Sequence, residues 1–300
     1  MKHSPPSDLD RHRGAQRSTW ASVLVNIGLS VLQIVVGLFA HSQALIADAI
    51  HSLSDLLSDF VVLIANRHSR QGPDADHPYG HLRYETAATL AIGGLLLAVG
   101  TGMLWNAVSA LREPSDIEAV HPIALAIALT ALCSKELLFR YMLRVAKRLR
   151  STMLAANAWH ARSDAASSLV VSVGVMANLA GLPLGDPLAA SIVGLMILRM
   201  GWKFSISAFH DLTDKAVDQE TEERIAKLLR ETPGVQGIHQ LRTRKLGDMI
   251  WVEVDLEMDG SLTISQGHEI AVAARARVMA EEPVLDVMTH FDPVTPGTKT

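Results

Sequence analysis

The stretch ADAIHSLSDLLSD, residues 47–59, lies inside a long apolar run and carries Asp48, His51, Asp55 and Asp59. On an α-helix this spacing places His51 above Asp55 on one face, with the other two carboxylates along the same side. An Asp at the middle of a bilayer costs roughly 2.5–3.5 kcal/mol. A membrane-spanning helix with several such groups therefore needs a compensating role for them, and a bound divalent cation would supply it.

Six apolar runs along the first two-thirds of the chain approach the length of about 20 residues that spans a bilayer as a helix. The runs cover Thr19–Ala40, Ala44–Ile64, Thr86–Leu111, Pro122–Tyr141, Ala156–Leu179 and Pro187–Phe204. The second and the fifth are the least apolar of the six. The fourth contains Lys135 and Glu136, so we expect it to face protein near one end.

Basic residues gather in alternate connections between these runs. Lys and Arg stand before the first run, between the second and third, and between the fourth and fifth, whereas the opposite connections hold only Arg112. By the positive-inside rule, both termini are expected on the cytoplasmic side of the cell membrane. A large water-soluble helical core, the alternative, would not sort its basic residues in this way.

The last third of the chain is polar and predicts a small α+β domain. Residues 219–234, QETEERIAKLLRETPG, have helical periodicity, and residues 265–282 predict a second helix. Residues 249–258, MIWVEVDLEM, alternate strictly between apolar and polar, which is typical of a half-buried strand. With strands at 235–245 and 284–292, the order is αββαβ. The sequence thus predicts a tail at 1–18, a six-helix transmembrane domain at 19–208, a cytoplasmic metal-binding domain at 209–292 and a tail at 293–300.

Two of the polar spans repeat one metal-ligand spacing. His51 and Asp55 in the second span recur as His160 and Asp164 in the fifth, each pair reading H-x-x-x-D. Two helices that each offer an imidazole and a carboxylate can close a four-ligand cage, which suits tetrahedral Zn²⁺. The alternative to a metal site is that these side chains form hydrogen bonds between the helices. The repetition on two polar spans favours the metal site.

Two further groups of His and Asp stand outside the spans. Asp74, His77 and His81 lie close together between the second and third spans. In the last third, possible ligands are carried by strands and a helix: His239, Asp255, His268, His290 and Asp292. Both groups suit zinc, although single residues of these types are common on surfaces without any ligand.

Composition and missing motifs exclude several other classes. The single Cys133 leaves no disulfide framework and no Cys-based metal site. A net charge of −4 and a basic LRTRK strand without aromatic residues do not indicate nucleic acid as a partner. No HExxH box supports the rival hypothesis of a membrane metalloenzyme. A metal sensor or scaffold that binds without transporting remains open from sequence.

The motifs ADAIHSLSD, DHPYGH, HARSD, HQLRTR and HFDP together resemble the cation diffusion facilitator family, and its YiiP-like zinc/iron branch in particular. The resemblance covers nearly the whole chain. It implies a homodimeric, proton-coupled exporter of divalent metal with six spans and a cytoplasmic domain of metallochaperone-like, ferredoxin-like fold. It implies no catalytic cofactor, with Zn²⁺ as both substrate and structural ion.

Matched residue by residue, the resemblance implies three metal sites and one ion pair. The intramembrane site is His51, Asp55, His160 and Asp164; the loop site is Asp74, His77 and His81; the C-terminal site is His239, Asp255, His268, His290 and Asp292; the ion pair between the two domains is Arg83 with Asp214.

Two positions depart from relatives in this branch. Some relatives carry Asp where His51 stands, and the resulting set of two imidazoles and two carboxylates favours Zn²⁺ over the harder Mn²⁺. Asp255 stands where a relative has His, which puts the affinity of the C-terminal site in question. The expected function is Zn²⁺ efflux across the inner membrane by proton antiport, with an Fe²⁺ or Cd²⁺ exporter as an alternative.

Overall fold

The computed structural model describes residues 8–69, 71–112, 119–149 and 152–294, and the chain divides into two compact units. The first unit contains Met1–Phe60 and Ile92–Lys203. The second contains Val61–Ala91 and Phe204–Thr300. The second unit therefore holds the α+β domain expected at 209–292 and, in addition, the loop between the second and third helices with the helix ends that flank it.

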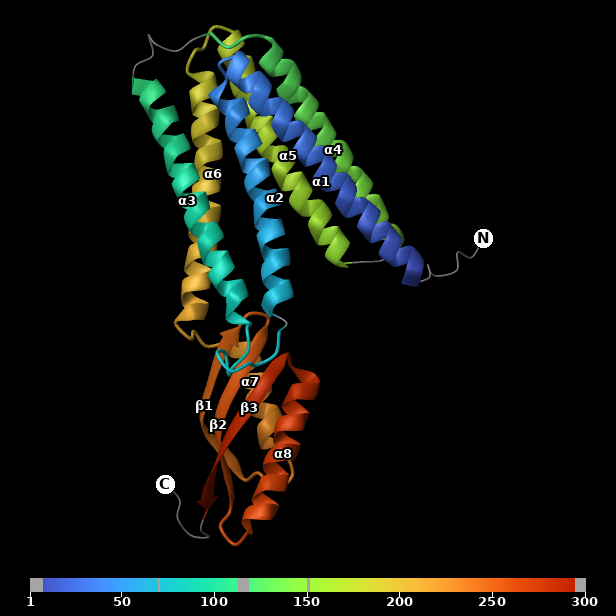
Figure 1. Cartoon of the computed structure of the whole chain (residues 1–300), viewed down its shortest axis with the longest axis vertical. Helices are drawn as coiled ribbons and strands as arrows, with labels where there is room; N and C mark the ends of the chain where they lie inside the picture. The colour runs from blue at the N-terminus through green and yellow to red at the C-terminus, as the bar shows by residue number, and fades with distance from the viewer. Residues whose placement is uncertain (1–7, 70, 113–118, 150–151, 295–300) are drawn as a thin grey trace. The chain divides into compact units, whose positions relative to one another are not determined.

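Six long helices precede the α+β domain in the described residues (Figure 1). They are α1 (Asp8–Phe39), α2 (Gln43–Ser69), α3 (Arg83–Arg112), α4 (Ile123–Leu149), α5 (Thr152–Leu179) and α6 (Gly185–Leu212). By length and hydropathy, three of the described helices could cross a membrane: α1 from Trp20, α3 and α6. The polar residues of α2, α4 and α5 lower their hydropathy, and their crossing stays a prediction.

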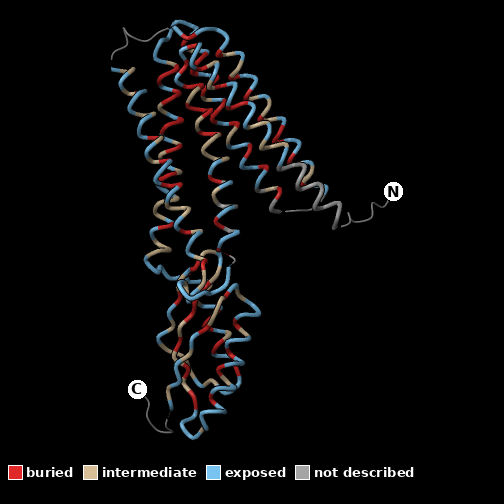
Figure 2. The backbone as a smooth tube through the Cα atoms, viewed as in Figure 1, coloured by how far each residue is buried: buried red, intermediate tan, exposed pale blue. Residues whose placement is uncertain are grey.

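The helical bundle buries a group of polar side chains among apolar ones, and it exposes many large apolar side chains. Buried polar side chains lie on α1, α2, α4 and α5: Ser30, Gln33, Asp48, Ser52, Lys135, Ser167 and Ser168. Large apolar side chains are exposed: Trp20, Leu24, Val31, Phe39, Trp105, Leu195 and Trp202. Figure 2 shows buried and exposed positions alternating along these helices. A water-soluble bundle rarely exposes so many large apolar side chains, so this unit is a helical membrane domain.

Glycines let α3 and α6 approach closely. A Cβ added to Gly100 on α3 would lie 3.0 Å from the backbone nitrogen of Leu198 on α6. One added to Gly201 on α6 would lie 2.9 Å from the backbone nitrogen of Leu97 on α3. Such contacts between small residues are how helices pack in lipid, where no hydrophobic force drives them together.

Three helices end in the same way, with one residue in the left-handed conformation. These residues are His41 after α1, Gly181 after α5 and Asp214 after α6, with φ of 54°, 94° and 57°. In each case the next residue donates its N–H to a carbonyl five positions earlier: Ser42 to Gly37, Leu182 to Ala177 and Lys215 to His210. This is the Schellman pattern, in which glycine is usual. His41 and Asp214 adopt it at a steric cost that glycine avoids.

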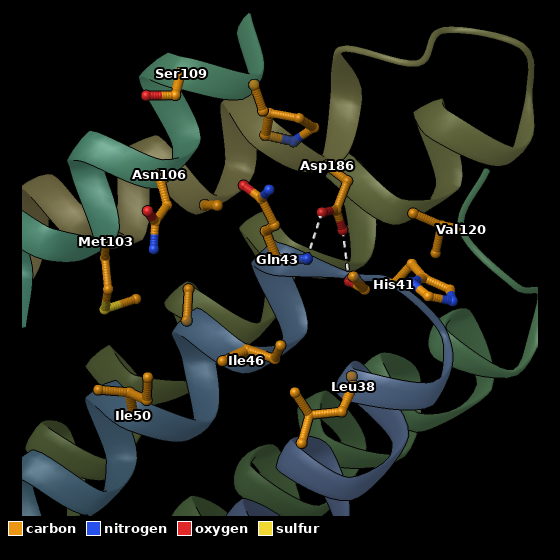
Figure 3. A pocket seen from close by; sticks show the side chains of 16 residues that line it. Leu38, His41, Gln43, Ile46, Ile50, Met103, Asn106, Ser109, Val120 and Asp186 are labelled. Carbon is orange, nitrogen blue, oxygen red and sulfur yellow. Dashed lines mark hydrogen bonds between the residues drawn. The ribbon is translucent and has the colours of Figure 1, made fainter. Parts of the chain in front are cut away.

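The start of α2 is capped by a carboxylate from α6. Asp186 accepts hydrogen bonds from the Ser42 hydroxyl at 2.5 Å and from the backbone N–H of Gln43 at 2.7 Å (Figure 3). It also accepts one from the backbone N–H of Ala44 at 3.1 Å. The Ser42 hydroxyl in turn accepts the N–H of Leu45 at 3.1 Å. A helix start leaves its first N–H groups without partners, and a negative charge there is favourable. Asp186 satisfies two of them while fixing α6 to α2.

The second unit contains a three-stranded sheet with two helices. The helices are α7 (Gln219–Arg230) and α8 (Ile264–Glu281); the strands are β1 (Gly237–Leu246), β2 (Met249–Asp259) and β3 (Val284–Val294). The strand order is β1-β2-β3, with β1 antiparallel and β3 parallel to β2. The predicted order αββαβ is confirmed.

The core of the α+β domain follows the predicted alternation along β2. Its even-numbered residues are all buried: Ile250, Val252, Val254, Leu256 and Met258. They pack with buried residues of α7 and α8, such as Ile225 and Val278. The opposite face of the sheet carries Glu253, Asp255 and Glu257, which are partly exposed. This open face presents the acidic side chains of the strand.

We expect Asp186→Ala to lower the free energy of unfolding of the detergent-solubilised protein by roughly 2–4 kcal/mol, because it leaves a buried hydroxyl and two N–H donors without an acceptor. Thermal unfolding followed by tryptophan fluorescence measures the loss. Asp218→Ala is the matched control: its carboxylate caps α7 in an exposed position, where water can replace it. That change should cost about 1 kcal/mol or less. Equal losses would contradict the proposed role of the buried cap.

Candidate metal centres

Helices α2 and α5 bring three of the expected intramembrane ligands together. His51, Asp55 and Asp164 each offer a ligand atom, and these atoms all lie within 4.8 Å of one another. His51 Nδ1 lies 3.7 Å from Asp55 Oδ2, and the two side chains are only 8% and 13% exposed. The spacing of four residues puts both on one face of α2, and Asp164 faces them from α5. One imidazole and two carboxylates form a set of ligands suited to a divalent cation.

One nitrogen of the His51 imidazole, Nδ1, is buried without a hydrogen bond, since no partner reaches it from the described part of the chain. A buried nitrogen without a hydrogen bond is costly, and most such atoms in folded proteins are satisfied. A bound cation would use this nitrogen as a ligand.

His160 is placed apart from this cluster. It lies one turn before Asp164 on α5, is exposed, and is not among the residues whose ligand atoms converge. The structure thus brings together three of the four ligands that the sequence predicts. His160 can complete a tetrahedral set only if its side chain turns toward the other three.

Asp48 belongs to a separate group of polar residues, one helical turn before His51. Its carboxylate is fully buried and lies 3.3 Å from Lys135 Nζ on α4. Sequence reasoning noticed both residues but did not pair them, because nothing in the spacing of α2 and α4 indicates the contact. The available signal was that the spans of Asp48 and Lys135 each carry ionisable residues, which need a partner inside a bilayer.

The loop between α2 and α3 gathers Asp74, His77 and His81. Asp74 Oδ1 lies 3.3 Å from His77 Nδ1, and Asp74 Oδ2 lies 3.3 Å from His81 Nε2. The other nitrogen of His81, Nδ1, lies 3.3 Å from the carbonyl oxygen of Gly72. A carbonyl only accepts, so Nδ1 donates to it, and Nε2 is the nitrogen that faces Asp74. This is the arrangement of a metal-binding histidine with its supporting hydrogen bond.

Backbone hydrogen bonds keep Asp74 ionised. The N–H groups of His77 and Asp76 donate to Asp74 Oδ1 at 2.7 and 3.0 Å. These bonds, with that of His77 the largest cause, hold the pKa of Asp74 below its ordinary value. The carboxylate therefore stays negative at mildly acidic pH and remains available as a ligand.

The three strands of the α+β domain each contribute one residue to a third cluster. His239 on β1 lies with Nε2 2.7 Å from Asp292 Oδ2 on β3, and with Nδ1 3.7 Å from Asp255 Oδ2 on β2. His239 and Asp255 are direct neighbours across the strands, and an irregularity in the strand follows between His239 and Arg242. The cluster lies on the open face of the sheet.

Two expected members of this C-terminal site stand apart. His290 lies beside Asp255 in the strand register, with its Nε2 3.5 Å from Asp292 Oδ1, but its side chain is 73% exposed. His268 is exposed on α8, which packs on the opposite face of the sheet. Three of the five predicted residues converge, a fourth is adjacent, and His268 is separate.

Arg83 and Asp214 are in contact within the second unit. Arg83 Nη2 donates to Asp214 Oδ1 at 2.5 Å, and Arg244 Nη1 lies 3.7 Å from Asp214 Oδ2. Both members of the first pair are 46% exposed, so the pair alone contributes at most about 1 kcal/mol. The rings of Tyr79 and Trp251 also meet edge to face at 5.8 Å. The loop and the sheet thus share several contacts.

A cavity of about 660 Å³ lies beside α2 at the end of the bundle where Asp186 caps that helix (Figure 3). Its wall includes Ile50, the neighbour of His51, but none of the clustered ligands. Asp186 is the one carboxylate among its lining residues, and three hydrogen-bond donors already engage it. His41 also lines the cavity, but neither residue belongs to one of the three clusters.

Comparison with known proteins finds matches along most of the chain. The profile named cation efflux transmembrane domain matches residues 19–213, and the profile named cation efflux protein, cytoplasmic domain, matches residues 217–294. Metal tolerance protein C1 of Arabidopsis thaliana is 35% identical over 283 residues, which cover 89% of this chain and 60% of that protein. The chain thus spans less than two-thirds of the length of that relative.

Two shorter relatives match from end to end. An uncharacterized transporter of Methanocaldococcus jannaschii is 33% identical over 280 residues, which cover 93% of this chain and 99% of that protein. The manganese efflux system protein MneS of Bacillus subtilis is 29% identical over 289 residues, covering 95% of this chain and 98% of that protein.

We expect His51→Ala to weaken divalent metal binding by about 100-fold and His160→Ala by about tenfold. His51 already faces the two carboxylates, whereas His160 must first reorient, which reduces what it contributes. Binding of Zn²⁺ to the purified full chain, by competition with a chelating dye, measures both. His68→Ala, a histidine elsewhere on α2, is the control and should change nothing. A larger loss for His160→Ala than for His51→Ala would show that the cluster described is not the binding geometry.

Proposed function

The chain belongs to the cation efflux family of divalent metal transporters, and from this premise we propose that it exports Zn²⁺ in exchange for protons. The observation that carries the proposal is the cluster of His51, Asp55 and Asp164 inside a bundle whose outer surface is apolar. Ionised carboxylates in such a place need a counter-charge, and a passing cation provides one.

The donor set suits zinc as a transported ion. With His160 turned inward, the cluster becomes two imidazoles and two carboxylates, the number of ligands that tetrahedral Zn²⁺ requires. All four positions come from protein, so none is reserved for the reactive water that a catalytic zinc needs. Transport explains this arrangement better than hydrolysis does.

Proton exchange follows from the same ligands. An imidazole binds metal only in its neutral form, and imidazoles ordinarily change protonation near pH 6.5. Protons therefore compete with metal for an imidazole ligand. A site that opens alternately to each side would carry metal one way and protons the other.

We further propose that the chain is a homodimer in the inner membrane with both termini in the cytoplasm. The alternation of basic connections supports the orientation. The match to a cytoplasmic domain of this family and the open face of the sheet support a partner for the second unit. Arg83 and Asp214 would then link the start of α3 to the end of α6 at the membrane boundary.

The loop and C-terminal clusters support a second role for metal. Asp74, His77 and His81 in one, and His239, Asp255 and Asp292 in the other, offer ligand atoms that lie within 4.8 Å of one another. We propose that these two clusters bind Zn²⁺ in a structural or sensing role and take no part in moving metal across the membrane.

A second candidate cargo is a harder ion, Mn²⁺ or Fe²⁺. The cluster as it stands has one nitrogen and two carboxylates, and oxygen-rich sites suit harder cations. One relative is named a manganese efflux protein. The involvement of His160 decides between the two cargoes.

We expect Asp164→Ala to abolish metal transport, because it removes a charged ligand and puts none in its place. Expression and assembly should stay intact. Uptake of Zn²⁺ into proteoliposomes, with and without an imposed pH gradient, measures transport. The wild type should respond several-fold to the gradient. Asp218→Ala, a carboxylate change far from any cluster in sequence and exposed, is the control. Full transport by Asp164→Ala would remove this cluster from the pathway, and uptake indifferent to the gradient would exclude proton antiport.

We expect His51→Asp to shift selectivity toward Mn²⁺ and Fe²⁺ by about tenfold relative to Zn²⁺, because a carboxylate replaces an imidazole. Competition among these metals for uptake by the same proteoliposomes gives the ratio. His68→Asp introduces the same charge elsewhere on α2 and should leave the ratio as it is. An unchanged ratio in His51→Asp would place selectivity outside this cluster.

A further inference from the structure

We propose that Lys135 is a positioning residue for the cation site: it neutralises Asp48 and holds the ligand-bearing helices α2 and α5 at a fixed spacing. The inference rests on the proposed function of the cluster formed by His51, Asp55 and Asp164. It assigns a role to a buried pair of charges that none of the three metal clusters includes.

The pair is buried completely. Asp48 is 0% and Lys135 is 1% exposed, and Lys135 Nζ lies 3.3 Å from each carboxylate oxygen of Asp48. Each charge alone would be very costly at this depth, and each is compensated by the other. The two residues therefore act as one neutral unit.

Neutral donors complete the shell of Asp48. Gln33 Nε2 donates to it at 2.7 Å from α1, and the hydroxyls of Ser167 and Ser168 donate at 2.7 and 2.6 Å from α5. Asp48 itself lies on α2 and Lys135 on α4. One carboxylate thus joins four helices, including both that carry the clustered ligands.

The same network reaches the backbone of a ligand. Lys135 Nζ donates to the Ser52 hydroxyl at 3.0 Å and approaches the carbonyl oxygen of Asp164 at 3.5 Å. The Ser167 hydroxyl also lies 2.7 Å from that carbonyl oxygen. Ser52 directly follows His51 in the chain. Lys135 therefore touches α2 and α5 at the residues that set the distance between His51 and Asp164.

Stability alone does not account for such a pair. Replacing a buried ion pair by apolar side chains of similar volume is often neutral or stabilising, so the pair is weak evidence of a stabilising role. Charge neutrality matters for the site, however. With Lys135 in place, Asp48 adds no net charge one turn from His51, and the charge that meets a cation comes from Asp55 and Asp164.

The test is the double change Lys135→Met with Asp48→Asn, which removes both charges together and leaves no buried ion unpaired. We expect its melting temperature and dimer to stay near those of the wild type, its KM for Zn²⁺ uptake to rise at least tenfold, and its kcat to change less than threefold. The affinity of purified full-length protein, read from the binding component that Asp164→Ala removes, should fall in parallel. An unchanged KM and affinity in a folded double variant would overturn the inference.

A smaller change tests the positioning role of Lys135 if the double variant does not fold. Ser167→Ala deletes one hydroxyl that joins Asp48 to the Asp164 carbonyl, and it should raise KM about threefold. Ser42→Ala deletes the equivalent hydroxyl from the other buried carboxylate, Asp186, and should lower stability without raising KM. Equal KM values for Ser167→Ala and the wild type would overturn the inference.

Failure of the inference and failure of the proposed function give different results. A wild type that binds metal without transporting it would overturn the proposed function, and the binding comparison would still decide the role of Lys135. Normal transport by the wild type with an unchanged double variant would overturn only the positioning role.

Discussion

The free-energy cost of placing a full charge inside a helical bundle that faces lipid is the constraint on which this structure depends. Each buried carboxylate of the bundle meets it differently. Asp48 is matched by an opposite charge and three neutral donors, and Asp186 by the N-terminus of a helix. Asp55 and Asp164 instead converge on His51. The first two arrangements satisfy their carboxylates with groups of the chain itself, whereas the third gathers two carboxylates around one imidazole, which is the basis of the proposed cation site.

Much of the fold follows from local sequence patterns. The αββαβ order and the buried face of β2 are confirmed because alternation and helical periodicity act within a few residues of chain. The two H-x-x-x-D motifs lie on α2 and α5, and three of their four residues come close together. The contact of Asp48 with Lys135 and the cap that Asp186 gives to Ser42 were not predicted. Their partners lie 87 and 144 positions apart, and no short-range pattern encodes such contacts.

The metal clusters also depend on long-range contacts that short sequence patterns do not encode. Helical spacing places His160 and Asp164 on one helix, one turn apart, but the direction of each side chain depends on neighbouring helices, and His160 lies outside the cluster. In the sheet, His239 and Asp255 meet because they are paired across two strands, and the parallel third strand adds Asp292. His268 is separated from them because α8 crosses behind the sheet. Sequence supplies the candidate ligands, and the packing of elements selects among them.

The cap formed by Asp186 also has a mechanical consequence. It fastens the first turn of α6 to the first turn of α2, so a motion that separates these helices has its pivot at this end. Helix α2 contains 27 residues and is about 40 Å long. Rotation by about 5° around the pivot would shift the far end by about 3–4 Å, while residues next to Asp186 hardly move. His51, two turns along α2, lies near the pivot, so the same rotation would shift its imidazole by only about 1 Å.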